Sequence, residues 1–214
     1  MIRDEKAKKK IKEAIVICIC GMAGSGKSTL AKKLAEKYGL KYCSGGDALK
    51  ALAKEEGYKP IEKGWWETKE GMQFLEERKK DSKFDMSVDK KFSDVAEEGN
   101  VIFDSWAQPW LLKKGFKIWL ESSLKERAER IANRDGIGVR EALKALRNME
   151  ERTTAIYKKL YGFSLGEDFT PFNLILDTDN LKAGEVFQVL CKVIDNVVVN
   201  SDTTKTLNNT QNCN

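Results

Sequence analysis

The chain of 214 residues contains no histidine. The chain therefore lacks both the commonest general base of enzymes and the commonest zinc ligand. The five cysteines include no pair with the spacing of a zinc knuckle. Cys18 and Cys20 lie two apart in an apolar run, and on a strand they would point to the same side of a sheet. We therefore expect buried, reduced thiols.

Long apolar stretches are also missing from the sequence. None approaches the roughly 20 residues that a membrane-spanning helix needs. The basic N-terminus is followed by only a short apolar segment, residues 14–20, which does not form a secretory signal. We expect a cytoplasmic protein with no membrane partner.

Basic side chains are only slightly more numerous than acidic ones. The chain has 38 basic and 33 acidic side chains, a formal net charge of +5, and part of the excess lies in residues 6–12. A nucleic-acid-binding protein tends to carry a concentrated basic stripe with interleaved aromatic residues, and no such stripe is evident. We expect no nucleic-acid partner, and a site for anionic phosphates explains the mild excess equally well.

Apolar runs alternate with segments of helical periodicity along the chain. The runs that predict strands are residues 14–20, 40–43, 101–104, 116–120 and 172–176. This alternation predicts an α/β fold of three layers, a five-stranded parallel sheet with helices on both faces. Residues 58–98 and 126–162 are polar and helix-prone, and we expect them to be insertions over the sheet rather than layers of it. A single domain would span residues 1–200, and the Asn/Thr-rich residues 201–214 predict a disordered tail.

A phosphate-binding motif occupies residues 21–28, Gly-Met-Ala-Gly-Ser-Gly-Lys-Ser, which fits G-x-x-x-x-G-K-[ST]. An apolar strand is expected before it and an amphipathic helix after it, which argues against a chance glycine-rich turn. The glycines permit a tight loop whose backbone N–H groups converge on phosphate oxygens, and the helix adds its positive dipole end. The residues assigned to triphosphate binding are Gly21, Ala23, Gly24, Ser25, Gly26, Lys27, Ser28 and Thr29.

The motif predicts a P-loop NTPase fold with a catalytic Lys27 and a magnesium site. Lys27 is placed to reach the outer phosphates, and the Ser28 hydroxyl can ligate Mg²⁺. Asp104 ends the third apolar run, at the crevice where open α/β sheets bind ligands, so it is the second expected metal ligand and a catalytic residue. An ordinary strand-ending aspartate is the alternative. ATP or GTP with Mg²⁺ are the expected cofactors, and by analogy a small chain with an N-terminal loop favours a kinase.

From about Ile15 to Val198 the sequence resembles the archaeal cytidylate kinase-like family of nucleoside monophosphate kinases. Blocks that match in order and spacing carry the resemblance, at residues 39–47, 97–104, 117–120, 127–134, 157–162 and 176–178. The resemblance implies a P-loop kinase core with a helical acceptor-binding region at about 44–98. It also implies a helical lid at about 126–162, whose closure would exclude water from the transfer.

The resemblance also implies roles for individual residues. The acceptor-facing candidates are Ser44, Asp47 and Lys50. Arginines of the lid would stabilise charge on the moving phosphoryl group. The catalytic candidates there are Arg130 and Arg134, followed by Arg140, with Arg152 weaker. An exposed, solvated charge is the alternative for each of these arginines.

Several positions depart from the family pattern. Trp106 stands where an arginine usually follows the strand-ending acid, and Lys50 replaces an arginine that helps to hold the acceptor phosphate. Lysine is a poorer bidentate clamp for phosphate. Met149 and Ile156 occupy lid positions that are often arginine. Trp106 and Trp110 are assigned to the acceptor pocket, because flat rings suit stacking on a base, although packing is the alternative for each.

Three functions follow from these observations. The first is ATP- and Mg²⁺-dependent transfer to a nucleoside monophosphate, cytidine monophosphate by resemblance, and an acidic acceptor of this kind needs no strong base. The second is a kinase for an uncharged hydroxyl acceptor, a nucleoside or vitamin-like alcohol, with Asp47 or Asp104 as the base. The third is a non-catalytic, nucleotide-binding regulatory protein that touches RNA through its basic arm. The acceptor is a small molecule in both kinase hypotheses, and a monomer or a homodimer fits either.

Overall fold

A computed structural model describes residues 14–62 and 64–199. It contains a five-stranded parallel sheet in the order β2-β3-β1-β4-β5, which confirms the expected sheet. The strands are β1 (Val16–Cys20), β2 (Lys41–Ser44), β3 (Val101–Asp104), β4 (Phe116–Glu121) and β5 (Leu174–Asp177). The basic arm and the tail predicted at 201–214 lie outside the described residues.

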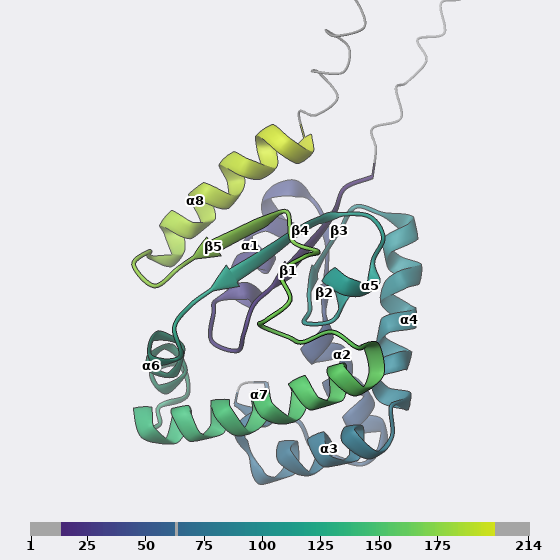
Figure 1. The fold of residues 1–214 in the computed structure, drawn as a ribbon, viewed down its shortest axis with the longest axis vertical. Helices are drawn as coiled ribbons and strands as arrows, with labels where there is room; N and C mark the ends of the chain where they lie inside the picture. The colour runs from purple at the N-terminus through teal and green to yellow at the C-terminus, as the bar shows by residue number, and fades with distance from the viewer. Residues whose placement is uncertain (1–13, 63, 200–214) are drawn as a thin grey trace, which may run out of the picture.

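Helices connect the strands and cover the sheet (Figure 1). They are α1 (Lys27–Tyr38), α2 (Gly45–Glu55), η1 (Trp65–Glu67), α3 (Lys69–Lys80), α4 (Lys83–Glu98), α5 (Gln108–Leu111), α6 (Leu124–Asp135), α7 (Val139–Tyr161), α8 (Ala183–Ile194) and η2 (Asp195–Val199). Glycine ends α1, where Gly39 adopts the left-handed conformation that side chains disfavour. In the described residues, no helix combines the length and the apolar character needed to cross a membrane.

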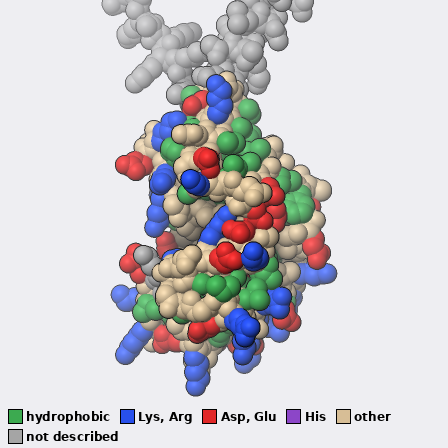
Figure 2. Space-filling view, turned by 90° about the vertical axis from the view of Figure 1, so that its left-hand side faces the viewer, with side chains coloured by type: hydrophobic (Ala, Val, Ile, Leu, Met, Phe, Trp, Pro, Cys, Tyr) green, Lys and Arg blue, Asp and Glu red, His purple; other side chains and the backbone are tan. Residues whose placement is uncertain are grey.

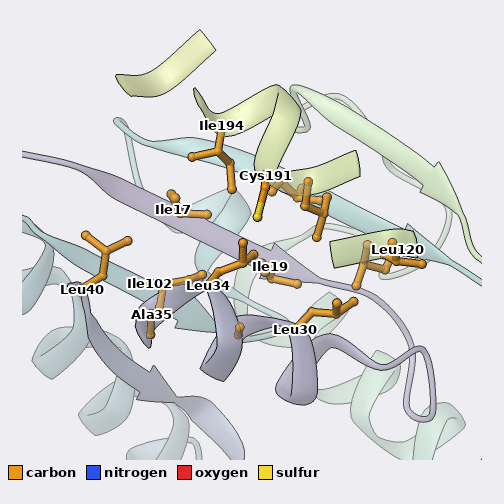
Figure 3. Packing of buried hydrophobic residues seen from close by; sticks show 14 residues of the cluster. Ile17, Ile19, Leu30, Leu34, Ala35, Leu40, Ile102, Leu120, Cys191 and Ile194 are labelled. Atoms are coloured by element: carbon orange, nitrogen blue, oxygen red, sulfur yellow. The ribbon is translucent and has the colours of Figure 1, made fainter. Parts of the chain in front are cut away.

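One face of the sheet packs against α1 and α8. Ile17 and Ile19 of β1 lie in a buried cluster with Leu34 of α1 and Cys191 of α8 (Figure 3). Because side chains alternate along a strand, Cys18 and Cys20 project from the opposite face. Both are fully buried free thiols, as expected, and burial raises the pKa of Cys18 to about 12.

The other face packs against α2, α4 and the C-terminal part of α7. Phe92 of α4 lies 5.1 Å, ring centroid to ring centroid, from Phe103 of β3. Ile156 of α7 lies in a buried cluster with Cys20 and Trp119 of the sheet. The three-layer architecture is therefore confirmed. The interpretation of 58–98 and 126–162 as insertions outside the layers is wrong for α4 and for the end of α7, whose apolar stripes cover this face directly.

The helices α3 and α6 and the N-terminal part of α7 extend beyond the carboxyl ends of the strands (Figure 1). Leu75 of α3 packs in a buried cluster with Ile131 of α6 and Met149 of α7. An ion pair between Glu76 and Arg152 also joins α3 to α7. On the face shown in Figure 2, acidic and basic side chains are interspersed, which matches the mixed-sign charge of the sequence.

Candidate active site

A cleft of about 780 Å³ lies at the carboxyl ends of β1, β2 and β3. This is the edge at which open parallel sheets bind ligands. Of the residues predicted from the sequence, those that line it are Ala23, Gly24, Gly26, Lys27, Ser28, Thr29, Ser44, Asp47, Lys50, Asp104, Trp106, Arg130 and Arg134. The structure therefore brings the expected donor, metal and acceptor residues to one cavity.

The phosphate-binding loop joins the end of β1 directly to the start of α1, as the motif requires. Gly24 and Gly26 have φ angles of 83° and 90°, a region that side chains rarely adopt. At Gly24 a Cβ would also lie 2.8 Å from the backbone oxygen of Arg127. Gly21 and Ser25 are buried in the loop rather than exposed in the cleft, and among the described residues the Ser25 hydroxyl has no hydrogen-bond partner. Glycine at position 24 is thus a steric requirement of this loop.

The first turn of α1 presents a positive end to the cleft. Lys27, Ser28 and Thr29 form this turn, which contains no acidic residue and no side-chain cap. The helix dipole is therefore left to attract an anion. The Lys27 Nζ lies 3.4 Å from the carbonyl oxygen of Met22 and 5.4 Å from the centroid of the Trp106 ring.

Asp104 and Ser28, the two expected magnesium ligands, both line the cleft and carry oxygen donors. Asp104 is buried at the end of β3, and its Oδ2 accepts a hydrogen bond from the Tyr42 hydroxyl at 3.1 Å. Carboxylate and hydroxyl oxygens are the hard ligands that Mg²⁺ prefers. No cluster of three or more acidic, cysteine or histidine side chains that could hold a metal occurs in the described part of the chain. A cation here would take its other ligands from phosphate and water, which is how Mg²⁺ binds in kinases.

Arg127, which the sequence analysis did not select, supports the back of the loop. It is buried, and its guanidinium donates to the carbonyl oxygens of Ala23 and Ser122, each at 3.0 Å. It also forms an ion pair with Glu150 of α7. Burial raises the pKa of Glu150, and the positive charge of Arg127 opposes that rise. The loop, α6 and α7 are therefore joined through one side chain.

The four candidate arginines lie in different environments. Arg130 and Arg134 of α6 line the cleft. Arg130 donates to the carbonyl oxygen and the hydroxyl of Thr178 at 2.8 and 3.2 Å, and Arg134 forms an ion pair with Asp135. Arg140 is exposed, Arg152 pairs with Glu76, and neither lines the cleft.

The side of the cleft that is expected to bind the acceptor is built from the start of α2 and the region after it. The Ser44 Oγ accepts a hydrogen bond from the Asp47 backbone N–H at 3.1 Å, so Ser44 is the N-cap of α2. The Lys50 ammonium donates to the carbonyl oxygen of Glu62 at 2.6 Å. Trp66 lines the same side.

Arg78, a second residue that was not selected, is buried in the wall of the cleft. Its Nη2 and Nε donate to the two carboxylate oxygens of Asp85 at 2.6 and 3.1 Å. Its guanidinium carbon also lies 5.8 Å from the centroid of the Trp66 ring. Arg78 stands in a densely charged stretch, so nothing in its neighbourhood in the sequence indicated a buried position.

The assignment of Trp110 to the acceptor pocket is corrected by the structure. Its ring stacks on Phe163 at a centroid distance of 4.1 Å, and its Nε1 donates to Asp168 Oδ2 at 2.8 Å. Trp110 is not among the residues that line the cleft. It packs in an aromatic cluster beside the sheet, the alternative that the sequence left open.

Comparison with known proteins agrees with this architecture. The model of the cytidylate kinase-like family matches residues 16–180. The cytidylate kinase of Pyrococcus horikoshii is 34% identical over 187 residues, which cover 87% of this chain and 91% of that relative. The cytidylate kinase of Methanopyrus kandleri is 32% identical over 200 residues, with coverage of 88% and 97%.

Two solved structures share the fold. An uncharacterized protein from Eubacterium ventriosum matches with a TM-score of 0.64 and 17% identity, covering 86% of this chain and 99% of that one. Shikimate kinase from Bacteroides thetaiotaomicron matches with a TM-score of 0.53 and 17% identity, covering 85% and 98%. These likenesses confirm the P-loop kinase fold. By the family match and by its identity to the two relatives, the chain belongs to the cytidylate kinase-like family and is a small-molecule kinase.

Proposed function

We propose that this kinase transfers the γ-phosphoryl group of ATP, with Mg²⁺, to cytidine monophosphate. The observation that carries the proposal is the single cleft, in which the phosphate-binding loop faces the start of α2. The named relatives, which are cytidylate kinases, support this acceptor. The region of residues 44–98 would bind the acceptor, and residues 126–162 would close over the triphosphate.

On the donor side, the backbone N–H groups of residues 21–29 would surround the phosphates, and Lys27 would contact the outer ones. Ser28 and Asp104 would hold Mg²⁺, which neutralises charge on the phosphates when it is bound. GTP would bind the same loop, because the loop contacts phosphates and not the base. Nucleotide preference is therefore decided elsewhere in the chain.

The chemistry needs positioning and charge stabilisation more than covalent catalysis. A monophosphate oxygen of the acceptor would attack the γ-phosphorus directly while the bond from that phosphorus to the β,γ-bridging oxygen breaks and ADP leaves. No protein nucleophile is required. Arg130 and Arg134 would stabilise charge on the transferred group, since both already line the cleft. Ser44, Asp47 and Lys50 would orient the acceptor.

One observation favours a second candidate, a kinase for an uncharged hydroxyl acceptor. Arg78 on the acceptor side is already bound to Asp85 through two hydrogen bonds, and the apolar Met149 also lines the cleft. An acceptor without a phosphate group would need no further cationic side chains for its binding. Asp104 or Asp47 would then take the hydroxyl proton.

An acceptor panel tests the proposal. The purified protein is assayed with ATP and Mg²⁺ against nucleoside monophosphates and the corresponding nucleosides, and product formation is followed by chromatography. We expect turnover of cytidine monophosphate and little with cytidine. Turnover of nucleosides without monophosphates would establish the second candidate. Chelation of Mg²⁺ by EDTA should abolish turnover, and substitution of GTP for ATP measures the donor preference.

A further inference from the structure

Trp106 connects the first residue of the phosphate-binding loop to Lys27. Its indole Nε1 donates to the carbonyl oxygen of Gly21 at 2.6 Å, and the Lys27 Nζ lies 5.4 Å from its ring centroid. We propose that Trp106 is a positioning residue for the phosphate-binding loop and for Lys27, and not a stacking platform for the acceptor. This inference rests on the proposed role of Lys27 in phosphoryl transfer.

The hydrogen bond from Trp106 holds the loop at Gly21, where the backbone is tightly packed. Gly21 is buried with a φ of 149°, and a Cβ there would lie 2.6 Å from the carbonyl oxygen of Leu120 on β4. A buried carbonyl that loses its hydrogen-bond donor destabilises the fold. The hydrogen bond therefore stabilises the loop conformation in which the Gly21 carbonyl points toward the indole of Trp106.

The contact with Lys27 is weak enough to be exchanged for phosphate. The attraction between a cation and the face of an aromatic ring is modest and weakens with exposure to water. Hydrogen bonds from an ammonium to phosphate oxygens are charge-assisted and stronger. The indole thus restricts the long lysine side chain, and an incoming polyphosphate replaces the ring as partner of the Lys27 ammonium. Restricting the side chain beforehand lowers the entropy lost on binding.

The surroundings of Trp106 leave little room for a stacked acceptor. Its ring packs against the buried cluster of Ala107 and Trp119 and also against the cluster of Ile131 and Met149. A flat acceptor would have to displace Lys27 from the ring in order to stack there.

A pair of matched variants, Trp106→Phe and Trp110→Phe, tests the inference. Each removes an indole N–H that donates a hydrogen bond, but Trp110 donates to Asp168 outside the cleft. Calorimetry measures the affinity for a non-hydrolysable ATP analogue with Mg²⁺, and steady-state assays measure kcat and the KM of each substrate. For Trp106→Phe we expect about fivefold weaker nucleotide binding and about tenfold lower kcat, with the acceptor KM within about twofold of the unmodified chain. Trp110→Phe should match the unmodified chain.

Two results would overturn the inference. One is a raised acceptor KM in Trp106→Phe with unchanged kcat and nucleotide affinity, which is the signature of a stacking platform. The other is a Trp106→Phe variant that equals Trp110→Phe in every measurement. If the unmodified chain turns over no acceptor, the proposed function fails, and the nucleotide affinities of the two variants still decide the role of Trp106.

A second measurement covers the case in which Trp106→Phe does not fold. The chain labelled with 5-fluorotryptophan gives one ¹⁹F resonance for each of its five tryptophans. Substitution of the other four in turn assigns the Trp106 resonance by elimination. We expect that resonance to shift on addition of nucleotide alone, as the Lys27 ammonium leaves the ring. A shift with the acceptor alone, and none with nucleotide, contradicts the inference.

Discussion

Arg127 and Ala23 share a hydrogen bond that fastens the phosphate-binding loop to α6. The Arg127 Nη1 donates to the Ala23 carbonyl oxygen at 3.0 Å, and the same guanidinium forms an ion pair with Glu150 of α7. Gly24 lies close against the backbone of Arg127. The loop is therefore supported by the two helices that would close over the triphosphate, and not by the sheet alone.

Replacement of Arg127 by methionine should destabilise the fold strongly. The variant leaves the partly buried Glu150 carboxylate without its cation, and removing one member of a buried pair costs about 3–5 kcal/mol. The double variant Arg127→Met/Glu150→Leu should cost less, because the buried charge is removed as well. Urea unfolding of the single and double variants measures both free energies. A double variant as unstable as the sum of the two singles would contradict the coupling.

Substitution of Gly24 by alanine should abolish tight nucleotide binding. The φ of 83° is unfavourable for alanine, and its Cβ would meet the Arg127 carbonyl oxygen at 2.8 Å, so the loop must shift. Gly184→Ala is the matched control, because a Cβ there would meet no atom within 4 Å and the backbone φ of Gly184 is not positive. Nucleotide titration should show at least about a hundredfold weaker binding for Gly24→Ala alone, equivalent to about 2.7 kcal/mol. Equal affinities in the two variants would exclude a steric role for Gly24.

Asp89 should give the stability of the protein a dependence on pH. Its carboxylate accepts hydrogen bonds from the Gln108 Nε2 at 2.8 Å and from the Tyr161 hydroxyl. Burial raises the pKa of Asp89 from 3.8 to about 6, with a smaller contribution from the charge of Asp85, while the hydrogen bonds and Arg78 oppose the rise. The folded state therefore binds this proton more tightly than the unfolded state. The resulting stability is present at pH 4 and is lost as the pH rises through 6.

Asp89→Asn removes this titration and isolates its effect. Between pH 4 and pH 7 the unmodified chain should lose about 1–3 kcal/mol of unfolding free energy relative to the variant. Urea unfolding of both proteins across this range supplies the comparison. Parallel profiles for the two proteins would show that Asp89 does not titrate differently in the folded state.

Asp104→Asn should lower turnover without preventing nucleotide binding. The amide keeps an oxygen for the Tyr42 hydroxyl, so the local packing survives, but it loses the charge that would help to hold Mg²⁺. We expect kcat to fall by about 10²–10³-fold and the Mg²⁺ concentration for half-maximal rate to rise. Titration of Mg²⁺ at saturating nucleotide measures both. An unchanged Mg²⁺ dependence would remove Asp104 from the metal site.

The parts of the fold that could be predicted from sequence are those dictated by local patterns. Short apolar runs located the five strands, and the loop motif located the strand-to-helix turn at residues 21–28. The stripe of Val88 and Phe92 was visible in the sequence as well. Its packing on Phe103 was not, because a stripe indicates that a helix has a buried face without saying which surface covers it.

The residues that were missed depend on tertiary pairing. Arg78 and Arg127 are charged residues in charged segments, a pattern that normally indicates a solvated surface. Their burial requires Asp85 and Glu150, which meet them only after the helices pack. Trp110 was assigned to the acceptor because an indole can stack on a base, but Phe163 supplies its partner instead. In each case the deciding contact joins separate helices or segments.

The most direct test of the account compares the unmodified chain with Lys27→Ala. Phosphoryl transfer from ATP to cytidine monophosphate is measured under saturating substrates, with folding of the variant checked by circular dichroism. Because the Lys27 charge matters most as the phosphoryl group moves, kcat should fall by about 10³-fold or more, while the variant stays folded. A folded Lys27→Ala variant that turns over at a comparable rate would contradict phosphoryl transfer at this loop.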